Sequence, residues 1–246
     1  MGRFGSLPMV ACMLPFLAVT PAHADDVDVA LVLVTDVSRS IDDTEFKLEK
    51  DGYASAFTNQ KVLEAIHSGP AGKIAVAYVE FASSFEVRTV LDWTLITDRA
   101  SAEAFVEHLE AEPRSFWGRT AISAGVDHAV QLMAETGLTA TRHVIDVCGD
   151  GTNNAGREAA DARDDAVKAG ITINGLAIIN EHPASWTFAH VQPPGGLANY
   201  YRENVTGGPG SFVLEVHDFS SFGEAMIRKL VDEIASGPAA KFATQP

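Results

Sequence analysis

The stretch at residues 27–35, VDVALVLVT, is the feature that most constrains what this chain can fold into. It is apolar at almost every position instead of alternating between apolar and polar residues, which is typical of a strand covered on both faces. Such strands occur mainly in parallel sheets that have a layer of helices on each side. The stretch therefore predicts a central strand of an α/β fold.

The rest of the chain alternates strand-like and helix-like segments. Further strands are predicted at residues 73–81, 85–95, 143–147, 171–179 and 212–216. Helices are predicted at residues 42–67, 97–109, 120–136, 156–169 and 220–234. Polar residues interrupt the strand at 85–95, so we expect it at the edge of the sheet. The alternation predicts one doubly wound, mainly parallel six-stranded sheet flanked by helices, a Rossmann-like arrangement in a single domain.

The amino terminus has the pattern of a secretory signal peptide. Arg3 precedes an apolar run at residues 7–19, and the small residues of Ala22-His23-Ala24 follow. We expect cleavage after Ala24, which leaves a domain at residues 25–236 and a loose tail at residues 237–246. The protein is then exported, to the periplasm or out of the cell.

Export also changes the cysteine count. Cys12 is lost with the signal peptide, so Cys148 is the single cysteine of the exported chain and no intrachain disulfide can form. Because Cys148 ends an apolar run at residues 144–148, we expect a buried, structural thiol.

The charge balance is strongly acidic. The chain has 33 Asp and Glu residues against 18 Lys and Arg residues, and its formal net charge is −15. No cluster of basic residues interrupts this excess. Nucleic acid and anionic membrane surfaces are therefore poor candidates as partners, whereas cations and basic proteins are better ones.

Oxygen-bearing side chains follow the predicted strands at their carboxyl ends, where open α/β sheets bind ligands. Asp36, Ser38 and Ser40 follow the first strand, Thr120 opens a helix, and Asp150 lies in the glycine-flanked turn of CGDGTNN. The alternate spacing of the first three allows one turn to direct three oxygens to one point. A donor set of oxygens alone suits a hard divalent cation, Mg²⁺ or Mn²⁺ before Zn²⁺.

Together these residues resemble the metal-ion-dependent adhesion site (MIDAS) of von Willebrand factor A (VWA) domains, such as integrin inserted domains. The resemblance covers nearly all of the exported chain, and an uncharacterised family of exported bacterial proteins is similar over the same length. It implies that Ser38 and Ser40 bind the metal directly and Thr120 directly or through water. It also implies that Asp36 and Asp150 act through water, which leaves a position for a partner's carboxylate.

The sequence departs from the family at the last element. The usual Thr-Asp-Gly is replaced by Gly149-Asp150-Gly151. The departure leaves open which neighbour supports Asp150.

Other interpretations of the same residues remain. Ser38, Ser40, Asp42 and Thr120 are common helix caps, and capping alone would leave a structural module with an empty site. A metal-dependent phosphoryl or ester hydrolase could use the same cluster. The GDGTN segment also resembles the phosphate-binding turn of nucleotide-binding kinases.

We expect a binding protein and not an enzyme, because no general base and no Walker, Gly-x-Ser-x-Gly or His-Glu-x-x-His motif accompanies the cluster. The expected function is binding of a protein partner that presents an acidic residue to the metal. Trp117 fits either the core or the rim of the site. The aromatic residues of the segment 180–210 either contact the partner or pack a short helix at residues 197–204 onto the sheet.

Overall fold

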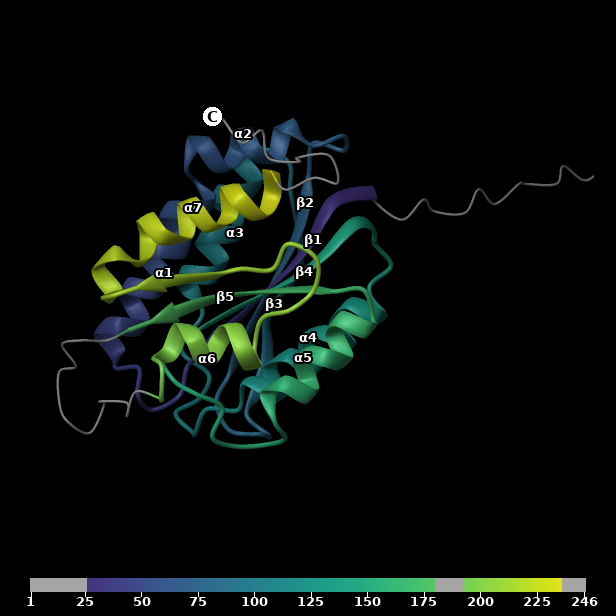
Figure 1. The fold of residues 1–246 in the computed structure, drawn as a ribbon. Helices are drawn as coiled ribbons and strands as arrows, with labels where there is room; N and C mark the ends of the chain where they lie inside the picture. The colour runs from purple at the N-terminus through teal and green to yellow at the C-terminus, as the bar shows by residue number, and fades with distance from the viewer. Residues whose placement is uncertain (1–25, 180–192, 236–246) are drawn as a thin grey trace, which may run out of the picture.

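A single six-stranded sheet lies at the centre of the molecule (Figure 1). Its strand order is β3-β2-β1-β4-β5-β6. The strands are β1 (Asp26–Asp36), β2 (Ile74–Phe81), β3 (Val87–Ile96), β4 (Thr139–Gly149), β5 (Thr172–Ile178) and β6 (Val213–Val216). All neighbours are parallel except β2 and β3, which are antiparallel. The predicted mainly parallel six-stranded sheet is confirmed, and the strand that polar residues interrupt is an edge strand.

The structure is a computed structural model that describes residues 26–179 and 193–235. The predicted signal peptide at residues 1–24 and tail at residues 237–246 lie outside the described residues. So do Trp186 and Phe188, two of the aromatic residues singled out in the sequence. No helix in the described ranges is long and apolar enough to cross a membrane.

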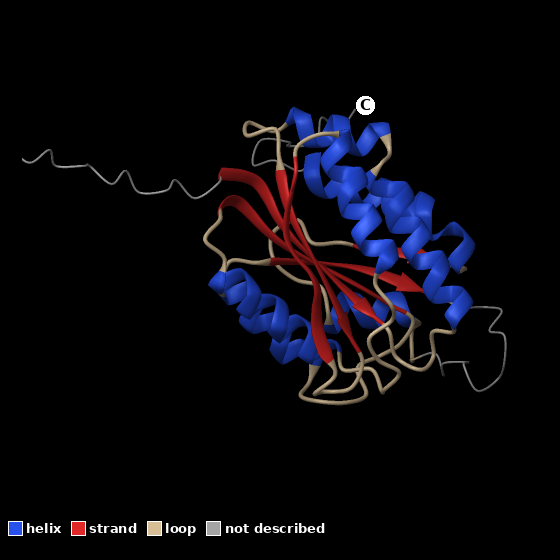
Figure 2. Ribbon diagram, turned by 180° about the vertical axis from the view of Figure 1, so that it is seen from behind, coloured by secondary structure: helices blue, strands red, loops and turns tan. Residues whose placement is uncertain are grey.

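Helices cover both faces of the sheet (Figure 2). On one face lie α1 (Asp43–Phe57), α2 (Gln60–Ser68), α3 (Arg99–Ala111) and α7 (Phe222–Ala235), which a short 3₁₀ helix (Phe219–Ser221) precedes. On the other lie α4 (Ile122–Glu135), α5 (Ala159–Lys168) and α6 (Leu197–Asn204). Alternate residues of β1 point into the two cores, Leu31 and Leu33 into one and Val32 and Val34 into the other. This double burial is what the apolar stretch predicted.

The helix predicted at residues 42–67 is instead two helices. Thr58 ends α1, and Asn59 caps α2 by accepting a hydrogen bond from the Lys61 backbone at 2.9 Å. Asparagine favours this capping position because its side chain replaces a missing helical acceptor. Val62 and Ile66 of α2 still face the core, so the apolar spacing predicts the buried face of the helix correctly but does not predict the break.

A buried ion cluster joins α7 to the sheet. Lys229 Nζ lies 2.5 Å from Asp146 Oδ1 of β4 and also contacts Glu233, and all three side chains are at most 1% exposed. Burial raises the pKa of Asp146 to about 7, and the charge of Glu233 adds to this rise while Lys229 opposes it. Lys229 thus compensates two carboxylates that have no access to water.

We expect Lys229→Met to lower the free energy of unfolding by about 3–5 kcal/mol, because it leaves two buried carboxylates without their cation. An acid whose pKa is raised by folding stabilises the fold at low pH, and this stability is lost as the pH rises through the folded-state pKa. The loss should therefore be larger at about pH 8 than at about pH 5 in urea unfolding. The exposed Arg228 of the same helix gives a matched control, Arg228→Met; equal losses at both pH values would contradict the assigned role of Lys229.

Candidate metal centre

Three loops meet at the end of the sheet where β1 and β4 finish, which is the lower end in Figure 1. They are residues 37–42 after β1, residues 112–121 between α3 and α4, and residues 150–158 after β4. These loops and the last residue of β1 carry every residue that the sequence singled out for the site. The five are Asp36, Ser38, Ser40, Thr120 and Asp150. None is more than 6% exposed. The structure thus brings together side chains that lie up to 114 positions apart in the sequence, counted from Asp36 to Asp150.

The side chains of the site form one continuous chain of hydrogen bonds. Thr120 Oγ1 donates to Ser38 Oγ at 3.1 Å, and the hydroxyls of Ser38 and Ser40 are 3.1 Å apart. Ser40 Oγ then donates to Asp150 Oδ1 at 2.8 Å. At the other end of the first loop, Asp36 Oδ1 accepts a hydrogen bond from the Ser38 backbone at 2.7 Å. Three hydroxyls and two carboxylates therefore share one small volume.

The capping interpretation holds for Asp42 and fails for the other residues. Asp42 caps α1 by accepting hydrogen bonds from the backbone of Thr44 and Glu45. The N-cap of α4 is Ala121, without a side-chain hydrogen bond, so Thr120 does not cap this helix. The Thr120 hydroxyl is directed to Ser38 instead.

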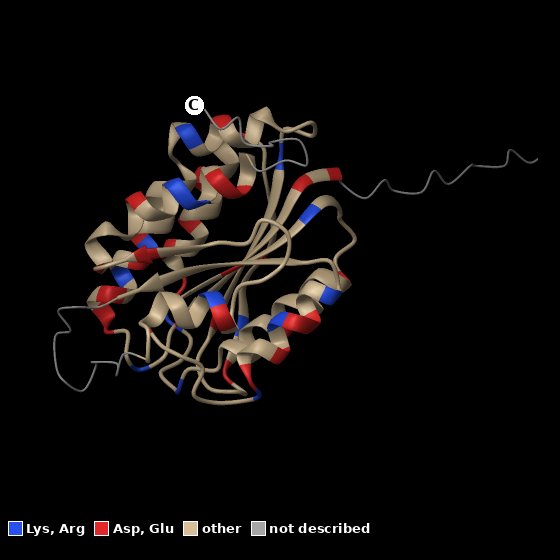
Figure 3. Ribbon diagram, in the orientation of Figure 1, with Lys and Arg blue, Asp and Glu red and all other residues tan. Residues whose placement is uncertain are grey.

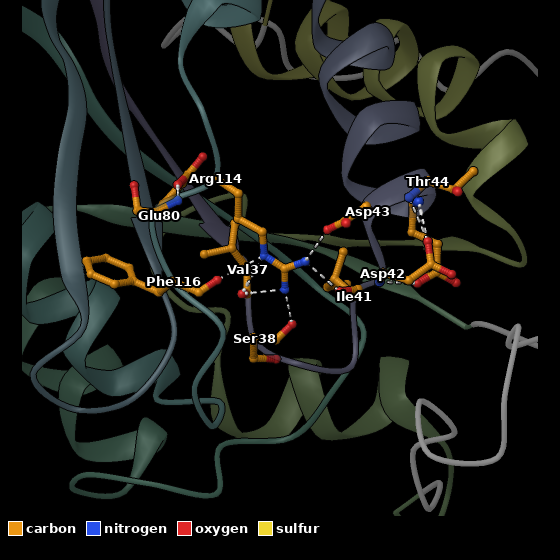
Figure 4. A network of polar contacts seen from close by, with 11 residues as sticks. Val37, Ser38, Ile41, Asp42, Asp43, Thr44, Glu80, Arg114 and Phe116 are labelled. Carbon is orange, nitrogen blue, oxygen red and sulfur yellow. Dashed lines mark hydrogen bonds and ion pairs between the residues drawn. The ribbon is translucent and has the colours of Figure 1, made fainter.

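Arg114 holds the first loop of the site in place (Figure 4). Its Nη2 donates to the carbonyl oxygens of Val37 at 2.8 Å and Ser38 at 2.6 Å, and its Nη1 donates to that of Ile41 at 2.8 Å. Its Nε donates to the carbonyl of Phe116 at 2.9 Å. One guanidinium thus ties the loop that carries Ser38 and Ser40 to the loop that leads to Thr120.

The surroundings of Arg114 fix its position. Its side chain is 4% exposed and lies 3.7 Å from Asp43 Oδ1. The guanidinium carbon is 5.8 Å from the ring centre of Phe46 and 5.3 Å from that of Trp117. Burial lowers the pKa of Arg114, while the charges of Asp43 and Asp36 raise it again. An arginine stays charged under these conditions, so the loop carbonyls face a permanent cation.

Two asparagines after Asp150 join the third loop to the second. Asn154 Oδ1 accepts a hydrogen bond from the Thr120 backbone at 3.0 Å, and the Asn154 backbone donates to the Thr120 carbonyl at 2.8 Å. Asn153 Oδ1 accepts from the Ser123 backbone at 3.1 Å. These contacts satisfy backbone donors at the start of α4 that have no helical partner. They also fix Thr120 relative to Asp150.

The glycine at position 149 has a steric reason. A Cβ there would lie 2.9 Å from both the Tyr201 hydroxyl and Asp36 Cβ, closer than real Cβ atoms approach other atoms. Tyr201 of α6 is fully buried, and among the described residues its hydroxyl has no hydrogen-bond partner. The space beside Asp36 that a larger residue at position 149 would need is therefore filled by the tyrosine. This accounts for the departure from Thr-Asp-Gly.

A buried carboxyl lies beneath the site. Cys148 Sγ, which is buried as predicted, donates to Glu49 Oε1 at 3.0 Å. Burial raises the pKa of Glu49 well above its usual range, and the charges of Asp36 and Asp150 add to the rise. The neutral form of Glu49 is therefore favoured, which limits the negative charge under the two aspartates.

The donor set fits a hard divalent cation. It consists of hydroxyl and carboxylate oxygens, with no imidazole or thiolate, which is the chemistry that Mg²⁺ and Mn²⁺ prefer. In the described part of the chain no group of three or more His, Cys, Asp or Glu side chains is arranged to hold a metal. A cation at this site would therefore depend on Ser38, Ser40 and Thr120 as well as on the aspartates. The role of the five residues as ligands stays a prediction.

The sequence did not single out Arg114 or Glu49, and it singled out Tyr201 only as one of the aromatic residues of the segment 180–210. Arg114 and Tyr201 act on backbone atoms and on a glycine, which carry no side-chain pattern, and Glu49 is one of several acidic residues of α1. The asparagines gave a signal, because two in succession after a glycine-flanked aspartate predict a structured turn.

Trp117 is 59% exposed, which assigns it to the rim. Tyr201 lies in the core, as the interpretation of 197–204 as a packed helix predicted.

Comparison with known protein families gives one match over almost the whole described chain. Residues 26–238 match a family described as a protein of unknown function (DUF1194). No protein of curated function is significantly similar to the sequence.

Solved structures with a similar fold include a von Willebrand factor type A protein and a protein with a MIDAS motif. Proximal thread matrix protein 1 from the mussel byssus has a TM-score of 0.62 at 16% identity, over 87% of this chain and 50% of its own. Another structure of that protein, with a zinc-occupied MIDAS motif, has a TM-score of 0.61 at 17% identity over 87% and 50% of the two chains. A von Willebrand factor type A protein from Catenulispora acidiphila has 0.58 at 15% identity over 85% and 43%. The fold is thus VWA-like, and the chain spans about half the length of the mussel protein.

We expect Arg114→Met to lower the free energy of unfolding by about 3 kcal/mol, because three loop carbonyls lose a charged donor. Arg114→Lys should recover only part of this loss, since one ammonium cannot replace a planar fork with several donors. Urea unfolding in the presence of a chelator measures both. The exposed Arg119 of the same loop provides the control Arg119→Met, for which we expect about 0.5 kcal/mol or less. Equal effects at the two positions would show that Arg114 does not hold the loop.

We expect Gly149→Ala to destabilise the protein by about 1–3 kcal/mol, because the added methyl group overlaps with Tyr201 and Asp36. Tyr201→Phe removes the hydroxyl oxygen, so the same glycine substitution should cost less in the Tyr201→Phe background. Thermal unfolding of the four proteins of this double-mutant cycle measures the difference. Strictly additive effects would mean that the tyrosine hydroxyl is not what requires glycine.

Proposed function

The chain belongs to the family described as a protein of unknown function (DUF1194), and we propose that its VWA-like domain binds a protein partner through a divalent cation. The observation that carries the proposal is the convergence of five oxygen-bearing side chains on one end of the sheet. They are Asp36, Ser38, Ser40, Thr120 and Asp150. Helix capping does not explain this donor set, because neither of the two serines nor Thr120 caps a helix.

In this proposal Ser38 and Ser40 bind the cation directly, and Thr120 binds it directly or through water. Asp36 and Asp150 balance its charge through bound water. When bound, the cation supplies a Lewis-acidic position that accepts a carboxylate of the partner. This offsets, at the site itself, the repulsion between an acidic partner and a chain of formal net charge −15.

Burial energetics support a role for a cation. Asp36 and Asp150 are 0% and 2% exposed, and a bound cation would stabilise carboxylates so removed from water. The oxygen donor set favours Mg²⁺ or Mn²⁺. The mussel protein with the zinc-occupied MIDAS motif gives a precedent for a divalent metal on this fold.

The position of the site supports a partner that docks on the surface. Two open hollows of about 490 and 390 Å³ lie elsewhere, the first beside Asp28 and Thr139 and the second beside Phe46 and Lys50. Neither is lined by a residue of the site. The pilus adhesin SpaC from Lactobacillus rhamnosus GG, whose fold is similar at 14% identity with a TM-score of 0.57, is a protein of adhesive function on this fold.

The proposed location of the protein is outside the cytoplasm. The sequence pattern of residues 1–24 supports export, to the periplasm or beyond the cell. Binding of a partner by an exported domain does not require a disulfide in this chain, because its two cores of buried residues supply the stability.

Metal binding can be tested by thermal unfolding of the purified protein after chelation, with and without millimolar Mg²⁺ or Mn²⁺. A cation that binds only the folded state at about 100 times its dissociation constant adds about 2.7 kcal/mol, which raises the midpoint by roughly 5–10 °C. We expect this rise in the wild type and in the surface control Asp161→Ala. It should be absent in Asp36→Ala. No rise in the wild type, or an equal rise in Asp36→Ala, would refute the site.

A further inference from the structure

Two of the most exposed apolar side chains lie on the loops around the metal centre. Among the described residues only Leu48, Phe85 and Trp117 are large, apolar and exposed. Phe85 is 100% exposed and Trp117 59%, while Leu48 on α1 is 37% exposed. Exposed aromatic residues are costly to hydrate and are enriched where proteins bind other proteins. Their position beside the site therefore needs an explanation.

The loop that carries Phe85 is fixed to the loop that carries Thr120. Phe85 lies in a turn closed by a 2.8 Å hydrogen bond from the Glu86 backbone to the Ser83 carbonyl. The Ser83 hydroxyl accepts a hydrogen bond from the Arg119 backbone at 2.8 Å. The neighbouring Ala82 carbonyl accepts one from the Ala121 backbone at 2.7 Å. Phe85 is thus exposed on a braced turn next to the site.

Trp117 is held by the residue that organises the metal loop. The guanidinium carbon of Arg114 lies 5.3 Å from the centre of the indole ring, within the range of a cation–π contact. Arg114 itself is fixed by its hydrogen bonds to the loop carbonyls. A partner that packs on Trp117 would therefore lose little side-chain entropy in ordering the indole.

Two exposed arginines lie on the same loops as the site residues. Arg39 separates Ser38 from Ser40, and its backbone donates to the Gly118 carbonyl at 3.0 Å. Arg119 precedes Thr120, and its Nε makes a long hydrogen bond of 3.3 Å to Asn154 Oδ1. Within residues 26–179 and 193–235 neither arginine forms a salt bridge. Figure 3 shows basic stretches on the loops at the lower end of the molecule, although the chain as a whole is acidic.

We propose that Arg39, Arg119, Phe85 and Trp117 form a rim around the metal centre that recognises an acidic, partly apolar protein segment. One carboxylate of the segment binds the cation, a second pairs with an arginine of the rim, and an apolar side chain packs on the aromatics. This inference rests on the proposed function and adds the chemistry of the partner. Charge complementarity carries it, because two arginines without ion pairs in an acidic chain favour a partner of negative charge.

Charge complementarity also decides between the classes of partner. The rim has two exposed cations, and nucleic acids and anionic membranes are usually bound by larger basic surfaces. Aromatic side chains at the centre of an interface favour a peptide that can bury an apolar residue against them. The occupant is therefore a segment of another protein.

The probe for this inference is a displayed library of random dodecapeptides. The library is bound to the immobilised protein in Mg²⁺ or Mn²⁺ and released with a chelator. We expect the released peptides to be enriched in sequences with two acidic residues and at least one aromatic or aliphatic residue nearby. Enrichment of basic peptides, or of acidic peptides without an apolar residue, would overturn the assigned chemistry of the rim.

A synthetic peptide from the selection then tests the residues. By fluorescence anisotropy, Arg39→Ala with Arg119→Ala, and Phe85→Ser with Trp117→Ser, should each weaken its binding at least about tenfold. Lys61→Ala on α2 and Leu48→Ser on α1 are the matched controls and should bind as the wild type does. Equal binding by the rim variants would overturn the rim and leave the proposed function intact.

A charge exchange separates recognition from damage to the fold. Arg119→Glu should weaken binding of the selected peptide, and a peptide in which the second acidic residue is lysine should regain affinity for this variant. A variant that is only misfolded would bind neither peptide better than the other.

A further outcome is that the library yields no peptide that a chelator releases while metal still raises the unfolding midpoint. The site then binds metal without a protein partner. In that case both the proposed function and the rim are wrong.

Discussion

The burial of strand β1 on both faces determines where chemistry can occur in this protein. From Val27 to Asp36 every residue of the strand is buried, with β2 and β4 on its sides and helices above and below. Polar side chains along it would lose their hydration, so functional groups accumulate where the strand leaves the sheet. The neighbouring strands β2 and β4 run parallel to it and end at the same edge. The loops that follow β1 and β4 therefore meet, and the loop between α3 and α4 that carries Thr120 joins them through hydrogen bonds to form the candidate metal centre.

Concentrating carboxylates at one edge creates an electrostatic problem that nearby residues reduce. The guanidinium of Arg114 lies behind the first loop and contributes a permanent positive charge. Burial raises the pKa of Glu49 beneath the site and favours its neutral form, which limits its repulsion of the aspartates. The hydroxyls add donors without adding charge. These neighbours offset part of the negative charge that Asp36 and Asp150 bring to one end of the sheet.

The sequence alone predicted the sheet and indicated five oxygen-bearing residues that meet at one end of it, because both leave periodic or local patterns; their role as ligands stays a prediction. Apolar runs, helical spacing and alternate oxygen-bearing residues are visible in the order of residues. The break between α1 and α2 was missed because Asn59 interrupts the helix without changing the apolar period. The contribution of Arg114 was not visible, since its acceptors are carbonyl groups that every residue has. Tyr201 was recognised as a packing residue, but its contact with Gly149 depends on how α6 lies on the sheet.

The contact between Gly149 and Tyr201 has a consequence for comparison among related chains. The two positions are 52 residues apart in sequence, counted from Gly149 to Tyr201, and compete for one volume beside Asp36. A side chain on the fourth strand and a tyrosine on the sixth helix cannot both occupy it. Within this family the two positions should therefore covary. Glycine should occur at position 149 where position 201 is tyrosine, and a larger residue only where position 201 has a smaller side chain or the ring lies farther from the strand. Such a pattern would divide the family into two solutions for the packing beneath one site.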